Sequence, residues 1–153
     1  MKFTLNDRPV EVEAQPHENA VDVMRKLGVH SVRESCAIGA CGCCTMIVDG
    51  KALSGCLLLA PLLEGTDVHT VEALTEDGSL HPVQEAFIEC SAFQCGFCTP
   101  GFILMVESLL KAHPNPTDQE IGDYLAGNLC RCASYPDILR AVRRASERRS
   151  ATI

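Results

Sequence analysis

Four cysteines and two glycines occupy the nine-residue stretch CAIGACGCC, residues 36–44, in a chain that holds ten cysteines among 153 residues. The N-terminal stretch MKFTLNDRPVEVEAQ has neither the apolar segment nor the small-residue cleavage site of a secretory signal. We therefore expect a cytoplasmic protein, in which thiols stay reduced and disulfides are rare. The favoured use for so many cysteines in such a compartment is to bind metal.

The first set of candidate ligands has the spacing C-x4-C-x2-C-x11-C and consists of Cys36, Cys41, Cys44 and Cys56. This is the spacing of plant-type 2Fe–2S sites. One tight loop must deliver three thiolates, and Gly39 and Gly42 can adopt the positive φ that turns backbone N–H groups toward the sulfurs. Cys43 is the extra thiol. As the neighbour of Cys44 at a strand entrance, it should point the opposite way and pack into the sheet. The alternative for Cys43 is a reactive or redox-sensing thiol.

The second set of candidate ligands consists of Cys95 and Cys98 in QCGFCTPG, with Cys130 and Cys132 in NLCRC. These cysteines fall at the ends of three predicted helices, where free N–H groups favour an anionic centre such as an iron–sulfur cluster. Structural zinc modules use similar spacing, so zinc is an alternative for this set. A Rieske centre needs two histidine ligands, and none of the five histidines lies inside a cysteine motif. Cys90 lies on an apolar helical stripe, and we interpret it as a core residue.

The hydrophobic pattern becomes helical from about residue 80, and residues 72–80, rich in acidic and small residues, are the candidate boundary. Before it, KFTL and VEVEA are separated by Asn6-Asp7-Arg8, which suggests a hairpin, and TMIV and DVHTVEAL read as further strands. One helix lies among these strands, and Asn19 is its expected N-cap. After it, four helical stripes follow, and Thr99 and Thr117 are the expected N-caps of the second and third helices. We expect an α+β chain with a β-grasp domain over residues 1–75 and a four-helix bundle over residues 76–153. A metal cluster would supplement the small core of each domain.

The charge pattern argues against some functions. A formal net charge of −7 disfavours nucleic-acid binding, which requires clustered cations. No apolar run approaches the roughly 18 residues that a membrane span requires. The C-terminal basic run is expected to be a solvated helix face with a frayed tail, and a partner-facing patch is the alternative. It comprises Arg140, Arg143, Arg144, Arg148 and Arg149.

The stretches RESCAIGACGCCTMIVDG, FQCGFCTPGF and GNLCRC closely resemble the small iron–sulfur subunit of the molybdenum hydroxylases. That family includes xanthine oxidase, aldehyde oxidoreductase and carbon monoxide dehydrogenase, and the resemblance extends from Lys2 to about Val142. It implies two 2Fe–2S clusters, the first in a β-grasp ferredoxin-like domain and the second in a helical domain. The first would lie near the FAD of a medium subunit, and the second near the molybdopterin, in a dinucleotide form, of a large subunit. The resemblance also implies a dimer of such heterotrimers.

The same resemblance identifies contacts to the pterin. Gln94 matches the glutamine that touches the pterin in relatives, and the backbone at Cys132 is expected to make a similar contact. Two features depart from the family pattern. Cys43 stands where relatives commonly have a small residue, and Ala133-Ser134 replaces the usual Thr-Gly after the last ligand.

No nucleotide-binding or nucleophile motif occurs in the chain, so no catalytic residue is expected in it. The hypothesis is an electron-transfer subunit of a molybdenum-containing oxidoreductase, relaying electrons between the molybdopterin and FAD subunits, with substrate chemistry on a partner chain. Two alternatives stay open: a free-standing ferredoxin-type carrier, and a zinc-binding interaction module.

Overall fold

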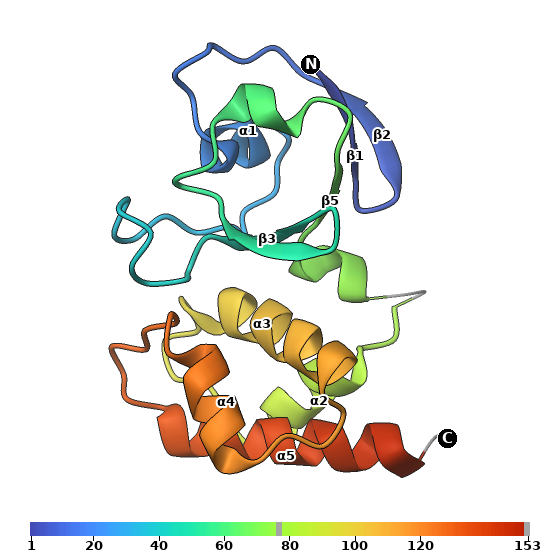
Figure 1. Ribbon diagram of the computed structural model, residues 1–153, viewed down its shortest axis with the longest axis vertical. Helices are drawn as coiled ribbons and strands as arrows, with labels where there is room; N and C mark the ends of the chain where they lie inside the picture. Colours follow the sequence, from blue (N-terminus) through green and yellow to red (C-terminus); the bar gives the residue numbers. More distant parts are fainter. Residues whose placement is uncertain (76–77, 152–153) are drawn as a thin grey trace.

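A five-stranded sheet forms the N-terminal half of the computed structural model, which describes residues 1–75 and 78–151 (Figure 1). The strand order is β2-β1-β5-β3-β4, in which β1 and β5 are parallel and every other neighbouring pair is antiparallel. The strands are β1 (Lys2–Leu5), β2 (Arg8–Glu11), β3 (Thr45–Val48), β4 (Lys51–Ser54) and β5 (Asp67–His69). Short 3-10 helices lie at Ala60–Leu63, before β5, and at Val71–Leu74, after it.

Local signals produce the first hairpin and the first helix, as predicted. Asn6 and Asp7 form the turn between β1 and β2, and both have positive φ, 49° and 62°. Such turns match the twist of the strands they connect. Asn19 caps α1 (Ala20–Lys26) by accepting the N–H of Asp22, and the Asp22 carboxylate accepts the N–H of Asn19. The buried face of α1 packs on the sheet and forms the N-terminal core with it.

The last strand is shorter than predicted. The sequence DVHTVEAL was expected to be a strand throughout, but β5 ends at His69 and a 3-10 helix begins at Val71. Between them, the N–H of Thr70 donates to Oδ1 of Asn6 at 2.9 Å, and Nδ2 of Asn6 donates to Oγ1 of Thr70 at 2.9 Å. The strand therefore ends where a side chain from the first hairpin takes over the backbone hydrogen bond.

Four helices form the C-terminal half of the described chain, with a core of their own. Thr117 caps its helix as predicted, by accepting the N–H of Glu120. The prediction for Thr99 was wrong by one residue: the helix begins at Thr99, and Cys98 is the N-cap, with no side-chain cap bond. The helices are α2 (Pro82–Glu89), α3 (Thr99–Ala112), α4 (Asp118–Leu125) and α5 (Tyr135–Ala151). Figure 1 shows α3 between the sheet and α5, so α3 joins the two halves.

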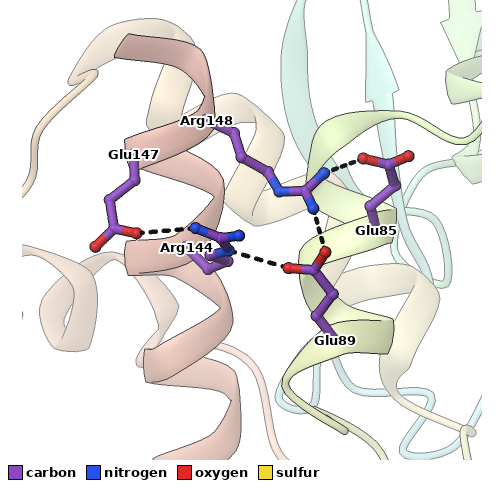
Figure 2. A network of polar contacts seen from close by, with 5 residues as sticks. All are labelled: Glu85, Glu89, Arg144, Glu147 and Arg148. Carbon is purple, nitrogen blue, oxygen red and sulfur yellow. Dashed lines mark hydrogen bonds and ion pairs between the residues drawn. The ribbon is translucent and has the colours of Figure 1, made fainter. Parts of the chain in front are cut away.

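The basic C-terminal run is paired with acidic residues rather than simply solvated. Figure 2 shows Arg148 between Glu85 and Glu89 of α2, with ion pairs to both. Arg144 also pairs with Glu89, at 3.0 Å between Nε and Oε2, and with Glu147 at 3.5 Å. Arg144 is exposed, as expected for a solvated face, whereas Arg148 is half-buried and departs from that expectation, because α5 lies along the acidic face of α2.

A buried carboxylate on α3 holds the C-terminal end of α5. Glu107 of α3 is 5% exposed, and Arg149 of α5 forms an ion pair with it. Nε2 of His81 lies 3.4 Å from the same carboxylate, and Nζ of Lys111 lies 3.3 Å from it. This cluster ties the last turns of α5 to the helix that contacts the sheet. No helix in the described ranges is long and apolar enough to cross a membrane.

Candidate metal centres

Two pairs of thiols make up the first set. The loop before β3 carries three of the four cysteines, and Cys56 follows β4. The thiol of Cys36 interacts with that of Cys41, and the thiol of Cys44 with that of Cys56; the extra thiol of Cys43 also interacts with Cys41. The N–H of Ala40 donates to Sγ of Cys36 at 3.3 Å, and the N–H of Cys56 donates to Sγ of Cys44 at 3.5 Å. Backbone donors therefore already point at the sulfurs of both pairs.

The loop of the first set requires glycine at a specific point. Gly42 has φ of 67°, as its expected role requires, and a Cβ atom there would lie 2.4 Å from Nδ2 of Asn128. Gly39 also has positive φ, 74°. A side chain at Gly42 would strain the loop and separate it from the chain that leads into the second set.

The second set is also arranged in two pairs. Cys95 contacts Cys132, and Cys98 contacts Cys130, so each pair joins the segment before α3 to the segment between α4 and α5. Nε2 of Gln94 donates to the carbonyl oxygen of Cys132 at 3.2 Å, at an exposed position. The two predicted pterin contacts, Gln94 and Cys132, are thus neighbours at the surface. Their contact with a pterin stays a prediction.

The environment shifts the pKa values of these thiols in opposite directions. The backbone N–H of Ile38, followed by the Cys41 side chain, lowers the pKa of Cys36 to about 6. Burial raises the pKa of Cys44 to about 11 and that of Cys98 to about 12. Cysteine binds metal as the thiolate, so a metal held by Cys44 and Cys98 would have to displace their protons.

The two sets meet at one open cavity of about 520 Å³. Its lining includes cysteines of both sets, namely Cys36, Cys41, Cys95, Cys98 and Cys130, together with Cys43. The backbone connects the sets directly, because the N–H of Leu129 donates to the carbonyl oxygen of Cys41 at 3.0 Å. Nδ2 of Asn128 donates to the carbonyl oxygen of Gly42 at 3.3 Å beside it. The loop of the first set is therefore held against the segment that leads into Cys130.

Cys43 is buried, at 4% exposure, but it does not pack into the sheet as predicted. Its backbone packs against Gly101 of α3 and the residue lines the cavity shared with the second set, while Cys44 belongs to the core of the sheet. Burial raises the pKa of Cys43 to about 12. A thiol held protonated is a poor nucleophile, which disfavours the redox-sensing alternative. Cys90 is the C-cap of α2 and lies half-buried at the edge of the helical core.

The donor set fits di-iron centres. All ten cysteines lie within the described residues, and each is a free thiol. No three Cys, His, Asp or Glu side chains in residues 1–75 and 78–151 are close enough to hold a single metal ion. Two pairs of thiols in each set match a cluster that four cysteines bind through two irons. The assignment of the eight ligands itself stays a prediction.

Sequence reasoning missed the residues that connect the two sets. Arg33 reaches from the first loop to the carbonyl oxygen of Gly96 in the second, and Asn128 and Leu129 contact the first loop from the helical half. Asn128 and Leu129 lie inside the quoted GNLCRC motif, and Arg33 begins RESC. These partners are more than sixty residues away, so spacing alone gives no sign of the contacts.

Comparison with known proteins decides the family. Residues 3–75 match the model of the 2Fe-2S iron-sulfur cluster binding domain, and residues 70–143 match that of a 2Fe-2S binding domain. The nicotinate dehydrogenase small FeS subunit of Eubacterium barkeri is 40% identical over 149 residues, 97% of this chain and 95% of that one. The xanthine dehydrogenase iron-sulfur-binding subunit of Escherichia coli O157:H7 is 42% identical over 144 residues, 93% and 91% of the two chains.

The chain belongs to the small iron–sulfur subunits of the molybdenum hydroxylases. A solved structure agrees: quinoline 2-oxidoreductase from Pseudomonas putida 86 superposes with a TM-score of 0.93 at 34% identity, over 97% of this chain and 95% of that chain. This small iron–sulfur subunit is therefore a 2Fe–2S-binding subunit of an oxidoreductase, with a mixed α/β fold.

Proposed function

We propose that this small iron–sulfur subunit relays electrons between a molybdopterin-containing subunit and an FAD-containing subunit. The observation that carries the proposal is that both cysteine sets line one cavity, with a main-chain hydrogen bond from Leu129 to Cys41 between them. When bound, two 2Fe–2S clusters supply one-electron redox chemistry at the two sets. The thiolates hold the clusters, and the N–H groups at Cys36 and Cys44 stabilise negative charge on the sulfurs.

The proposal assigns one partner to each set. The second set faces the molybdopterin, in a dinucleotide form, and Gln94 and the Cys132 backbone contact the pterin. Support comes from the exposed position of their hydrogen bond. The first set faces the FAD of the medium subunit. Its outer side carries the exposed apolar side chains of Ile38 and Leu57, 72% and 61% exposed, as a protein interface would.

The assembly that we propose is a dimer of heterotrimers, each with this small subunit, a large molybdopterin subunit and a medium FAD subunit. The relatives named as small subunits support the presence of larger partners. The reducing environment that free thiols need before cluster insertion favours a cytoplasmic location. Substrate chemistry would take place on the large subunit.

Two domains are also part of the proposal. We infer a β-grasp domain over residues 1–75 and a four-helix domain over residues 76–153, each with one cluster. The separate buried cores of the two halves support this division. The boundary lies beside residues 76 and 77, which are outside the described residues.

Purification of the chain with its natural partners tests the relay. We expect a brown complex that contains molybdenum and FAD on larger chains, with the absorption of 2Fe–2S clusters and two EPR signals from this chain. A monomer that is fully functional without partners would favour a free ferredoxin-type carrier. Zinc in place of iron would favour an interaction module and refute the relay.

A further inference from the structure

Arg33 connects the two candidate centres. Its backbone N–H donates to the carbonyl oxygen of Cys43, at 3.1 Å, beside the first set. Its side chain extends the other way: Nη1 donates to the carbonyl oxygen of Gly96 at 2.5 Å, and the guanidinium carbon lies 5.4 Å from the centre of the Phe97 ring. Gly96 and Phe97 are the two residues between Cys95 and Cys98. The guanidinium of the N-terminal half therefore lies against the loop of the second set.

The charge of this guanidinium is not neutralised by a carboxylate. Across residues 1–75 and 78–151, no carboxylate forms an ion pair with Arg33, and its polar contact is a neutral carbonyl. The arginines of α5 differ, because each of Arg140, Arg143, Arg144, Arg148 and Arg149 pairs with an acidic side chain. Arginine stays protonated at every pH that a folded protein tolerates. Arg33 thus presents a permanent, half-buried positive charge to the second set.

Reduction makes either centre more negative. One electron enters, one negative charge is added to the centre that holds it, and no proton moves and no bond forms. The reduction potential of an iron–sulfur cluster depends on nearby charge and hydrogen bonds. A positive charge close to one of two centres therefore stabilises the electron on that centre, and the stabilisation is larger where the charge is partly shielded from water.

We propose that Arg33 raises the reduction potential of the second-set cluster relative to that of the first, and so sets where a single electron resides in the subunit. The inference rests on the proposed function, since it requires a 2Fe–2S cluster at each set. Arg33 acts through its positive charge, which stabilises the added electron on the second-set cluster, and it does not bind iron. The N-terminal half thereby controls the centre that the C-terminal half binds.

The test is a redox titration of the full chain in its purified assembly, with dithionite as the electron donor and the two EPR signals as the readout. Arg33→Gln removes the charge but keeps a donor for Gly96, and Arg33→Met is a second neutral variant that keeps an apolar stem against Phe97. Arg33→Lys keeps the charge. The matched control is Arg25→Gln, which removes the same charge from an exposed position on α1.

In both neutral variants we expect the ratio of reduced second cluster to reduced first cluster to fall by about tenfold, which corresponds to about 59 mV for a one-electron couple. Arg33→Lys and Arg25→Gln should leave the distribution within about threefold of the wild type. An unchanged distribution in the neutral variants overturns the proposal. An equal shift in Arg33→Lys also overturns it, because loop geometry would then be the cause. Loss of the second cluster from both neutral variants would show that Arg33 is needed for that cluster to bind, and this would also overturn the proposal.

The proposed function fails in a different way. A wild-type protein that lacks two 2Fe–2S signals refutes the relay before any variant is measured. A wild type with both signals, and with variants that do not shift them, refutes only the role of Arg33.

Discussion

Gly101, on the first turn of α3, packs against the carbonyl oxygen of Gly42, so that a Cβ atom at position 101 would lie 2.2 Å from that oxygen. The same oxygen accepts hydrogen bonds from Thr45 and Asn128. Backbone therefore meets backbone where the helix contacts the first cysteine loop. Displacing either partner would cost free energy. Gly101 belongs to a helix, and the Gly42 carbonyl oxygen accepts three hydrogen bonds from Thr45 and Asn128.

Gly101→Ala should therefore destabilise the protein by about 1–3 kcal/mol, as an overpacked contact does. It should also weaken loading of the first cluster. Urea unfolding and iron analysis measure the two effects. Gly122→Ala is the matched control, because position 122 of α4 has no atom within 4 Å of the added Cβ and alanine favours a helix. Equal stability of Gly101→Ala and the wild type would show that the loop yields without cost.

Cys98→Ser should abolish the EPR signal of the second cluster and retain that of the first. The physical reason is that Cys98 pairs with Cys130, while the first set has its own four thiols. Iron content should fall by half. Cys44→Ser is the reciprocal variant and should abolish the other signal. Disappearance of both signals in Cys98→Ser would mean that the two centres do not load independently.

Cys43→Ala should retain both clusters, because the sulfur at position 43 is assigned to packing and not to iron. Removal of one buried sulfur at the contact with α3 should cost about 1 kcal/mol of unfolding free energy. EPR and thermal unfolding on the same sample measure both quantities. If Cys43→Ala lost the first cluster while Cys44→Ala kept it, the ligand register would have to be revised.

Glu107→Gln should destabilise the chain by about 2 kcal/mol, since a buried carboxylate with two cationic neighbours, Arg149 and Lys111, would lose its charge-assisted bonds. Urea unfolding of the cluster-loaded chain gives the value. Glu147→Gln is the control at an exposed end of the Figure 2 network, with its side chain 68% exposed, and should change stability little. If Glu107→Gln lowered the unfolding free energy no more than Glu147→Gln does, the stabilising role of the buried carboxylate would be refuted.

Local features of the fold were accessible from the sequence. The N-caps at Asn19 and Thr117 bond within four residues of themselves, and the turn at Asn6 and Asp7 depends only on its own backbone. The grouping of cysteines into two sets has the same origin, because the spacing of ligands around a cluster is largely a property of one loop.

Features that depend on distant residues were missed or wrong. The strand at β5 ends early because of Asn6, sixty-four residues away along the chain from Thr70. The arginines of α5 meet carboxylates on α2 that lie more than fifty residues before them. The backbone at Cys43 packs against α3 because Gly101 has no side chain to keep the two apart, and a pattern of alternating side chains within one strand contains no information about that helix.

The bond from the Leu129 amide to the Cys41 carbonyl involves only atoms that every amino acid other than proline possesses. Mutation of Leu129 to any residue other than proline can therefore keep this link between the two cysteine loops. The main chain thereby fixes the spacing of the two candidate centres, while the side chain at position 129 is free to vary.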